Sequence, residues 1–252
     1  MDFGVPEELT ALRASFASFV DREVRPVEES VREELISPSP DPDLLYEAAM
    51  TVKERSVRDG FYSAHMPESV GGWGLSTLGT ALLVEDAAAS GLRLAMVAIA
   101  PPNPAGPSAL LLDLPEHLWD DYVRPVVRGE KTMCFALTEP EAGSDAQAIR
   151  TSARRDGDSW VIDGHKHYIT NADRADFAVV FAVTDPEKRA AGGITAFVVP
   201  RGEFTSGRTQ WTMADTHPGE IHLDSARVPA DHVIGEVGLG FFAAMRFLNA
   251  GR

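Results

Sequence analysis

The sequence predicts an α+β protein, with an N-terminal α-helical domain followed by a small antiparallel β-barrel or β-sandwich domain and the first part of a C-terminal helix. Three observations predict it. Apolar residues recur at helical spacing through the first half, short β-rich runs separated by turn residues begin at Lys131, and the helical period returns after Gly238. We therefore expect three domains along the 252 residues: a helical domain at 1–130, a β-domain at 131–236 and the start of a helical domain at 237–252.

The helices are predicted from periodicity and from their boundary residues. Pro6–Val27 carries Leu, Phe and Val at spacings of three and four. Prolines at alternate positions then interrupt the helix, and Asp43 is expected to cap a second helix that ends at Gly60. Two more helices are expected, at Ser76–Ser90 and Pro115–Arg128.

The β-domain is predicted from short runs rich in β-branched and aromatic residues, separated by Asp-Gly, Thr-Asp-Pro and Gly-Gly turns. The expected strands are Thr132–Leu137, Ile149–Arg154, Ser159–Ile162, His167–Thr170, Phe177–Val183, Ile194–Val199 and Glu220–Leu223. After them, the helix from Phe241 carries an apolar stripe whose packing partners we expect to be missing from this chain: Phe241, Phe242, Met245 and Leu248.

Composition excludes several classes of function. The 23 basic and 38 acidic residues give a formal charge of −15, which argues against nucleic-acid binding. The apolar runs are too short to cross a membrane, and the acidic N-terminus has no signal core, so a soluble cytoplasmic protein is expected. The lone Cys134 is expected to be a buried structural thiol, and the seven histidines show no metal-ligand spacing, so no metal site is expected.

The segment Thr138–Asp145, Thr-Glu-Pro-Glu-Ala-Gly-Ser-Asp, has a composition that suits ligand binding. It follows a strand and contains a proline turn, after which Gly143 and Ser144 could offer backbone N–H groups to an anion or a polar ligand. A plain surface turn capped by Ser144 or Asp145 explains the same residues equally well.

A second segment, Asp156–Asn171, favours ligand binding over a plain surface turn. It reads as a hairpin followed by a strand on which Tyr168 and Thr170 face the same way. An aromatic ring and a hydroxyl on one face could hold a flat heterocycle and hydrogen-bond its edge.

Both segments, in this order and separation, resemble the two flavin-contacting motifs of the acyl-CoA dehydrogenase family. Three further landmarks are similar to that family: Met66–Ser76, Ala226–Ala230 and Ile234–Phe241. The resemblance implies an FAD-dependent enzyme that oxidises an acyl-CoA thioester to its 2,3-enoyl product. It also implies a homo-oligomer (dimer or tetramer) when complete, and electron-transfer flavoprotein as electron acceptor.

The resemblance also assigns residues. Thr138 would hydrogen-bond the pyrimidine side of the flavin, Thr170 would reach toward N5, and Tyr168 stands where the family usually has Trp. The implied cofactor contacts are Phe135, Leu137, Thr138, Gly143, Ser144, Tyr168, Ile169 and Thr170; the implied substrate contacts are Ser144, Asn249 and Arg252. His165 and His167 match no family site and are expected to have turn and core roles.

The family's chemistry needs a carboxylate base, and the resemblance implies that this sequence does not supply it. Most members carry the Glu in a C-terminal domain that we expect to be missing here. Some carry it at the position of Gly251, which has no side chain to accept a proton. We therefore expect a truncated chain that is inactive alone. A non-catalytic subunit of a heteromeric flavoenzyme and a flavin monooxygenase of the same fold remain alternatives, and the length of the acyl chain cannot be read.

Overall fold

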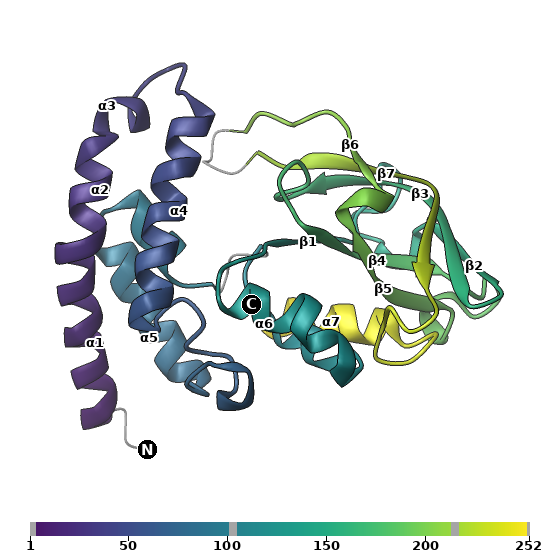
Figure 1. The fold of residues 1–252 in the computed structure, drawn as a ribbon, viewed down its shortest axis with the longest axis horizontal. Helices are drawn as coiled ribbons and strands as arrows, with labels where there is room; N and C mark the ends of the chain where they lie inside the picture. Colours follow the sequence, from purple (N-terminus) through teal and green to yellow (C-terminus); the bar gives the residue numbers. More distant parts are fainter. Residues whose placement is uncertain (1–3, 101–104, 213–216, 251–252) are drawn as a thin grey trace. The chain divides into compact units, whose positions relative to one another are not determined.

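The computed structural model describes residues 4–100, 105–212 and 217–250, and the chain divides into two compact units (Figure 1). Unit 1 comprises Met1–Asn103 with Val127–Gly129, and unit 2 comprises Pro104–Val126 with Glu130–Arg252. Unit 1 is helical, and unit 2 holds the sheet. The order of a helical part followed by an antiparallel-rich sheet is the order that the sequence predicts. The exact boundaries of the three expected domains stay a prediction.

The first helical stretch runs from α1 (Glu7–Phe19) through a π-helical turn (Val20–Val24) into α2 (Arg25–Ser30). It therefore continues beyond the predicted end at Val27. Its buried face carries Phe16 and Phe19, whose rings lie 5.1 and 5.2 Å from that of Phe61. This aromatic cluster belongs to the core of unit 1.

The second long helix, α4 (Pro42–Asp59), starts one residue before the predicted boundary. The Asp41 side chain accepts hydrogen bonds from the backbone N–H groups of Asp43 and Leu44, so Asp41, and not Asp43, caps the helix. The reason is Pro42, which fits the first helical position because it has no N–H to leave unpaired. The helix ends at Gly60, as predicted, with φ +86°.

The remaining helices differ in regularity. The expected Pro115–Arg128 helix is broken into a 3-10 turn, a π-helical turn and a short α-helix, because Pro125 cannot donate to the preceding turn. The other helical elements are α3 (Arg32–Leu35), α5 (Thr77–Ala89) capped by Ser76, α6 (Arg124–Val127) and α7 (Gly240–Ala250). Single 3-10 turns lie at Glu68–Val70, Arg93–Ala98, Ala109–Asp113, Ala146–Ala148, Arg189–Ala191 and Arg201–Glu203.

Unit 2 contains one mixed sheet in the order β6-β7-β3-β2-β4-β5-β8, with β1 also paired to β4. The sheet is not closed, so the barrel alternative is wrong. β1 pairs with β4 in parallel, and the other main ladders are antiparallel. The strands are β1 (Met133–Ala136), β2 (Ser152–Asp156), β3 (Ser159–Ile169), β4 (Phe177–Val183), β5 (Ile194–Pro200), β6 (Thr205–Ser206), β7 (Gly219–Pro229) and β8 (Val233–Ile234).

In the structure, two predicted strands, Ser159–Ile162 and His167–Thr170, are joined into the single strand β3. β3 is continuous from Ser159 to Ile169 because it pairs along its length with β7, and register shifts between Ile162 and Gly164 and between Lys166 and Ile169 absorb the irregular residues. β4 is buried at every position, which fits a strand covered on both faces. Cys134 lies in this core as expected, and burial raises the pKa of its thiol.

The last helix, α7, finds packing partners within unit 2, on β5 and the 3-10 turn at Ala109–Asp113. The expectation of an unpartnered stripe is therefore wrong for most of its members. Phe241, Met245 and Leu248 are half-buried, and Phe242 is exposed. The small residues Ala243 and Ala244 are buried.

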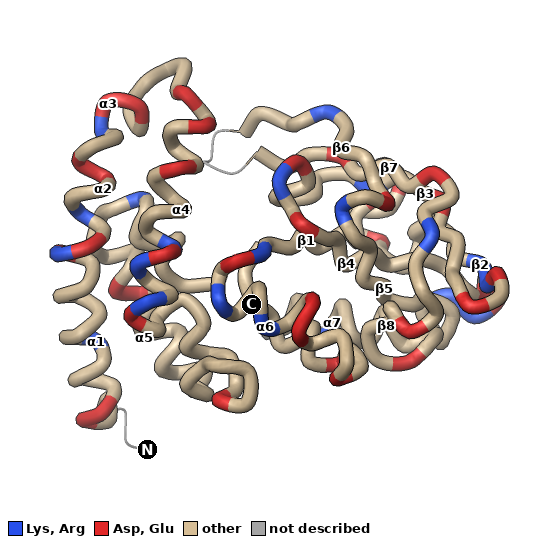
Figure 2. The backbone as a smooth tube through the Cα atoms, in the orientation of Figure 1, with Lys and Arg blue, Asp and Glu red and all other residues tan. Residues whose placement is uncertain are grey.

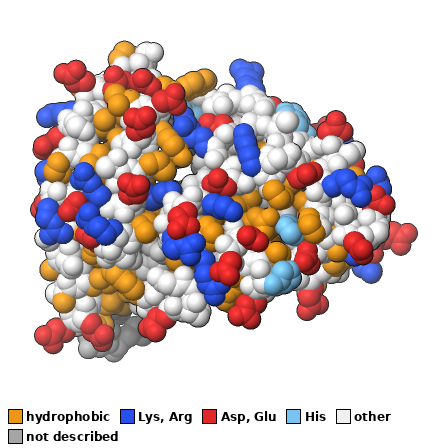
Figure 3. Space-filling model, viewed as in Figure 1, with side chains coloured by type: hydrophobic (Ala, Val, Ile, Leu, Met, Phe, Trp, Pro, Cys, Tyr) orange, Lys and Arg blue, Asp and Glu red, His pale blue; other side chains and the backbone are white. Residues whose placement is uncertain are grey.

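Charged residues of both signs are spread along both units (Figure 2). On the face shown in Figure 3, acidic and basic groups alternate and do not form one basic surface. No helix within the described ranges is both long and apolar enough to span a membrane.

Candidate functional site

The two motif segments lie side by side in unit 2. The backbone N–H of His167 donates to the carbonyl oxygen of Thr138 at 2.9 Å. The Asn171 side chain donates from Nδ2 to the carbonyl oxygen of Met133 at 3.1 Å. The end of β3 and the segment that follows β1 are thus joined, although about 30 residues separate them in sequence.

A buried ion pair strengthens this junction. Lys166 Nζ lies 2.8 Å from Glu139 Oε1 and also donates to the carbonyl oxygens of Leu137 and Phe181, at 3.1 and 2.8 Å. The lysine side chain is fully buried. Because this lysine extends from the second motif's strand and its ammonium group binds both the first motif and β4, it fixes the relative positions of all three.

The electrostatics of this pair follow from its burial. Burial lowers the pKa of Lys166 to about 8, against the opposing attraction of Glu139. Burial alone would raise the pKa of Glu139, but the Lys166 charge and hydrogen bonds from Lys166, Thr151 and the Arg150 backbone outweigh it and lower that pKa. Both oxygens of Glu139 are used, since Oε2 and Oε1 also accept from the N–H groups of Arg150 and Thr151.

The first motif forms a tight turn that exposes its glycine and serine. Glu139 and Ala142 exchange both backbone hydrogen bonds, at 3.0 and 3.1 Å. Gly143 and Ser144 follow on the surface, and within the described part of the chain their backbone N–H groups have no hydrogen-bond partner. Asp145 caps the next 3-10 turn through Gln147 N, as one of the two predicted caps.

The end of β3 departs from the regular strand that the sequence predicts. The strand stops at Ile169, and Thr170 is in a turn. Tyr168 has φ +56°, in the left-handed region. The regular alternation of side chains between the two faces of a strand, from which we predicted that Tyr168 and Thr170 face the same way, therefore does not apply here. The register shift between Lys166 and Ile169 accounts for this irregular backbone. The side chains of Lys166 and Ile169 are both buried, and Tyr168 between them is turned outward.

Exposure divides the predicted cofactor contacts into two groups. The Tyr168 side chain is 59% exposed and has its ring against that of His167, while Thr138 and Thr170 are half-buried. Leu137 and Ile169 are buried, so only their backbone groups could meet a ligand.

Phe135 and α7 meet in this unit. The Phe135 ring stacks on that of Phe247 at 4.5 Å and contacts that of Phe181 at 4.9 Å. Asn249, two residues beyond Phe247, is exposed. Arg252 and Gly251 lie outside the described residues.

Sequence reasoning missed Lys166 and Glu139, the two residues that hold the motifs together. One sign was available: Lys166 lies in an otherwise β-rich segment, and a lysine is rarely fully buried unless it is paired. Its partner could not be chosen, because 38 acidic residues compete for it.

The chain is similar to known proteins over most of its length. Family models described as "Acyl-CoA dehydrogenase, N-terminal domain" and "Acyl-CoA dehydrogenase, middle domain" match residues 6–130 and 134–226. A probable acyl-CoA dehydrogenase of Mycobacterium bovis is 33% identical over 252 residues, 98% of this chain and 61% of that protein. The caffeyl-CoA reductase-Etf complex subunit CarC of Acetobacterium woodii is 35% identical over 206 residues, 80% of this chain and 54% of that protein.

A solved structure, acyl-CoA dehydrogenase complexed with FAD from Bacillus anthracis, has a TM-score of 0.77 and 26% identity, covering 98% of this chain and 40% of that one. The chain thus spans less than two thirds of the length of each of these three proteins. Both family models and the relatives lead to one assignment: the chain belongs to the acyl-CoA dehydrogenase family.

Proposed function

We propose that this chain forms one wall of an FAD site in an acyl-CoA dehydrogenase that introduces a double bond between Cα and Cβ of an acyl-CoA thioester. The observation that carries the proposal is the junction of the two motif segments through Lys166, Glu139 and the His167–Thr138 hydrogen bond. The relative from Mycobacterium bovis is named for this activity, and the solved structure from Bacillus anthracis is named as holding FAD.

The residues at the junction fit a flavin. An exposed aromatic ring, Tyr168, can pack on a flat heterocycle, and the hydroxyl groups of Thr138 and Thr170 can hydrogen-bond its polar edge. Gly143 and Ser144 offer backbone N–H groups to a phosphate, and a phosphate can approach closely because nothing lies within 4 Å of a Cβ built at Gly143. The buried Leu137 and Ile169 would contribute backbone groups only.

Bound FAD supplies the hydride acceptor for this reaction. In the proposal, Tyr168 and Phe135 orient the ring system, Thr170 hydrogen-bonds near N5, and Thr138 hydrogen-bonds the pyrimidine side. Ser144 contacts both cofactor and substrate, and Asn249 and Arg252 approach the CoA portion. The Lys166–Glu139 pair keeps the two segments at a fixed separation, so its role is to position them.

The base that takes the Cα proton is proposed to lie outside residues 1–252, because Gly251 has no side chain that can accept a proton. A second candidate function is suggested by the name of CarC, which is a subunit of a caffeyl-CoA reductase-Etf complex and therefore works in an assembly of several polypeptides. In that reading, the chain is a non-catalytic subunit that completes a flavin site with a related polypeptide. Electron-transfer flavoprotein is the proposed electron acceptor in either case.

The flavin wall is tested by titrating the chain with FAD and following flavin fluorescence. We expect Tyr168→Ala to weaken FAD binding by about 5- to 150-fold, since stacking of a planar base on an aromatic ring contributes about 1–3 kcal/mol. Trp211→Ala is the matched control, because Trp211 is also an exposed aromatic residue of unit 2 and is not a proposed contact. Equal FAD affinity for wild type and Tyr168→Ala would show that this tyrosine is not part of a flavin site.

Reduction of the flavin by acyl-CoA tests the dehydrogenase activity and the external base. The FAD-loaded chain is mixed without oxygen with acyl-CoAs of several chain lengths, first alone and then with a related polypeptide, and loss of the visible flavin absorption is recorded. We expect no loss with the chain alone and loss in the mixture. Turnover by the chain alone would contradict the proposed external base, and no loss in any FAD-loaded mixture would contradict the dehydrogenase proposal.

A further inference from the structure

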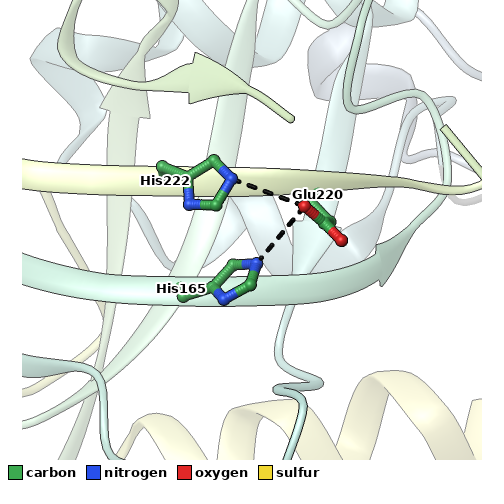
Figure 4. Close-up of side chains that lie close together, drawn as sticks. All are labelled: His165, Glu220 and His222. Carbon is green, nitrogen blue, oxygen red and sulfur yellow. Dashed lines mark ion pairs between the residues drawn. The ribbon is translucent and has the colours of Figure 1, made fainter. Parts of the chain in front are cut away.

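Three potential metal-ligating side chains converge on one face of the β3–β7 ladder, outside the proposed flavin contacts (Figure 4). His165 on β3 pairs directly with His222 on β7, and their rings stack at 4.3 Å with 23° between their planes. Glu220 lies two residues before His222, so its side chain emerges on the same face. The sequence could not reveal this group, because 54 residues of chain separate His165 from the pair on β7.

The ligand atoms are spaced as they would be around one ion. Glu220 Oε2 lies 3.6 Å from His165 Nε2 and 3.5 Å from His222 Nε2, and one ligand atom from each of the three residues lies within 4.8 Å of the others. Metal–ligand bonds of about 2.0–2.1 Å in a tetrahedron place neighbouring ligand atoms about 3.3 Å apart. The two distances from Glu220 Oε2, to His165 Nε2 and to His222 Nε2, are therefore within a few tenths of an ångström of that spacing.

Hydrogen bonding leaves part of this group unsatisfied. The buried atoms His165 Nε2 and His167 Nδ1 have no hydrogen-bond partner in the described chain. His167 Nδ1 lies 3.4 Å from Glu220 Oε1, and the Arg208 backbone N–H donates to Oε2 at 3.4 Å. A cation bound by His165 Nε2 and Glu220 would give the unpaired nitrogen of His165 a partner.

The backbone is shaped around this group. A Cβ at Gly207, just after β6, would lie 2.5 Å from His222 Nε2 and 2.7 Å from Glu220 Oε2. Glycine at this position therefore lets the segment lie over the cluster without displacing the His222 and Glu220 side chains. Solvent still reaches it from the other side, since the side chains of His165 and His222 are 39% and 44% exposed.

We propose that His165, His222 and Glu220 bind one divalent transition-metal ion of the Zn²⁺ class. Two imidazoles and one carboxylate suit this class better than Ca²⁺ or Mg²⁺, which prefer all-oxygen ligands. His167 Nδ1 faces the second oxygen of Glu220 at 3.4 Å, and the exposed side leaves a coordination position for water. The ion joins β3 to β7 just before Tyr168, where regular pairing of β3 ends.

The test uses the chain without a polyhistidine tag, stripped of metal by a chelator that is then removed. Zn²⁺ is titrated in competition with a chromophoric chelator. We expect one Zn²⁺ ion to bind per chain. His222→Asn and Glu220→Gln should each weaken Zn²⁺ binding by at least about tenfold, because losing even a residue that only hydrogen-bonds a metal ligand typically weakens binding by about that factor. Absence of stoichiometric binding by wild type would overturn the proposal.

The matched control is His117→Asn. His117 is an exposed histidine of the same unit that pairs with a single carboxylate, Asp231, at 2.8 Å. This variant should bind Zn²⁺ like wild type. Wild-type affinity in both cluster variants, or equal loss in the control, would overturn the assignment.

A second measurement needs no variant. X-ray absorption at the zinc edge of the wild-type complex should show two imidazole nitrogens with oxygen ligands, and an all-oxygen shell would contradict the site. Neither measurement involves FAD or acyl-CoA, so the outcome is independent of the proposed function.

Discussion

Lys166 shows how a single residue can organise the candidate site. Its ammonium group is buried and binds Glu139, Leu137 and Phe181, so it joins both motif segments to β4. Removing one partner of a buried pair leaves the other charge in a medium that solvates it poorly. The pair should therefore matter far more than the ion pairs on the surface.

Lys166→Met should lower the free energy of unfolding by about 3–5 kcal/mol, because Glu139 loses its cation. The double variant Lys166→Met/Glu139→Gln should lose less free energy of unfolding than the sum of the losses in the two single variants. Arg227→Met is the control, since its pair with Asp156 is about half exposed, so that solvent screens the interaction and its loss should change the free energy of unfolding far less. Urea unfolding followed by circular dichroism measures all four variants, and equal costs for Lys166→Met and Arg227→Met would contradict the buried-pair interpretation.

The same pair predicts an acid dependence. The pKa of Glu139 is lowered from its ordinary value of 4.5, so below that value the unfolded chain binds more protons than the folded one. Its contribution is therefore fully present above 4.5 and is lost as the pH falls through the folded pKa. The loss of stability between about pH 5 and pH 3 should be smaller in Glu139→Gln than in wild type. Parallel curves for the two proteins over that range would show that Glu139 does not contribute.

At the scale of elements, α7 depends on glycines as much as on its apolar residues. Gly238 has φ +89° and its N–H donates to Thr195 Oγ1 at 2.8 Å. A Cβ at Gly240 would overlap the backbone nitrogen of Ala196 on β5. The Gly-Leu-Gly sequence therefore allows the start of the helix to lie directly against the sheet.

Gly240→Ala should destabilise the chain by about 1–3 kcal/mol, the usual cost of forcing extra atoms into a packed region. Gly202→Ala is the matched control, because a Cβ there meets nothing within 4 Å. Thermal unfolding of the two variants measures the difference. If Gly240→Ala were as stable as Gly202→Ala, the close contact of α7 with β5 would not be a constraint.

At the scale of the whole molecule, the formal charge of −15 is spread along both units. Such an excess of one sign destabilises a compact chain through self-repulsion, and salt screens that repulsion. The midpoint of thermal unfolding should rise as NaCl increases from about 10 mM to about 150 mM, over which the Debye length falls from about 30 to about 8 Å. At pH 4.8, near the sequence pI, this rise should largely disappear. An equal rise at both pH values would exclude self-repulsion as its cause.

The sequence by itself determined the order of helices and strands, the strand β4 to the residue, the buried Cys134 and the family, because each depends on local periodicity or on a contiguous motif. Only the tertiary structure decided that the sheet stays open, that α7 packs on β5, and that the left-handed Tyr168 breaks the alternation at the end of β3. It also decided which of 38 acidic residues pairs with Lys166 and that His165 meets Glu220 and His222. These outcomes depend on strand register and on contacts between distant residues, and a one-residue change of register would reverse which side chains meet.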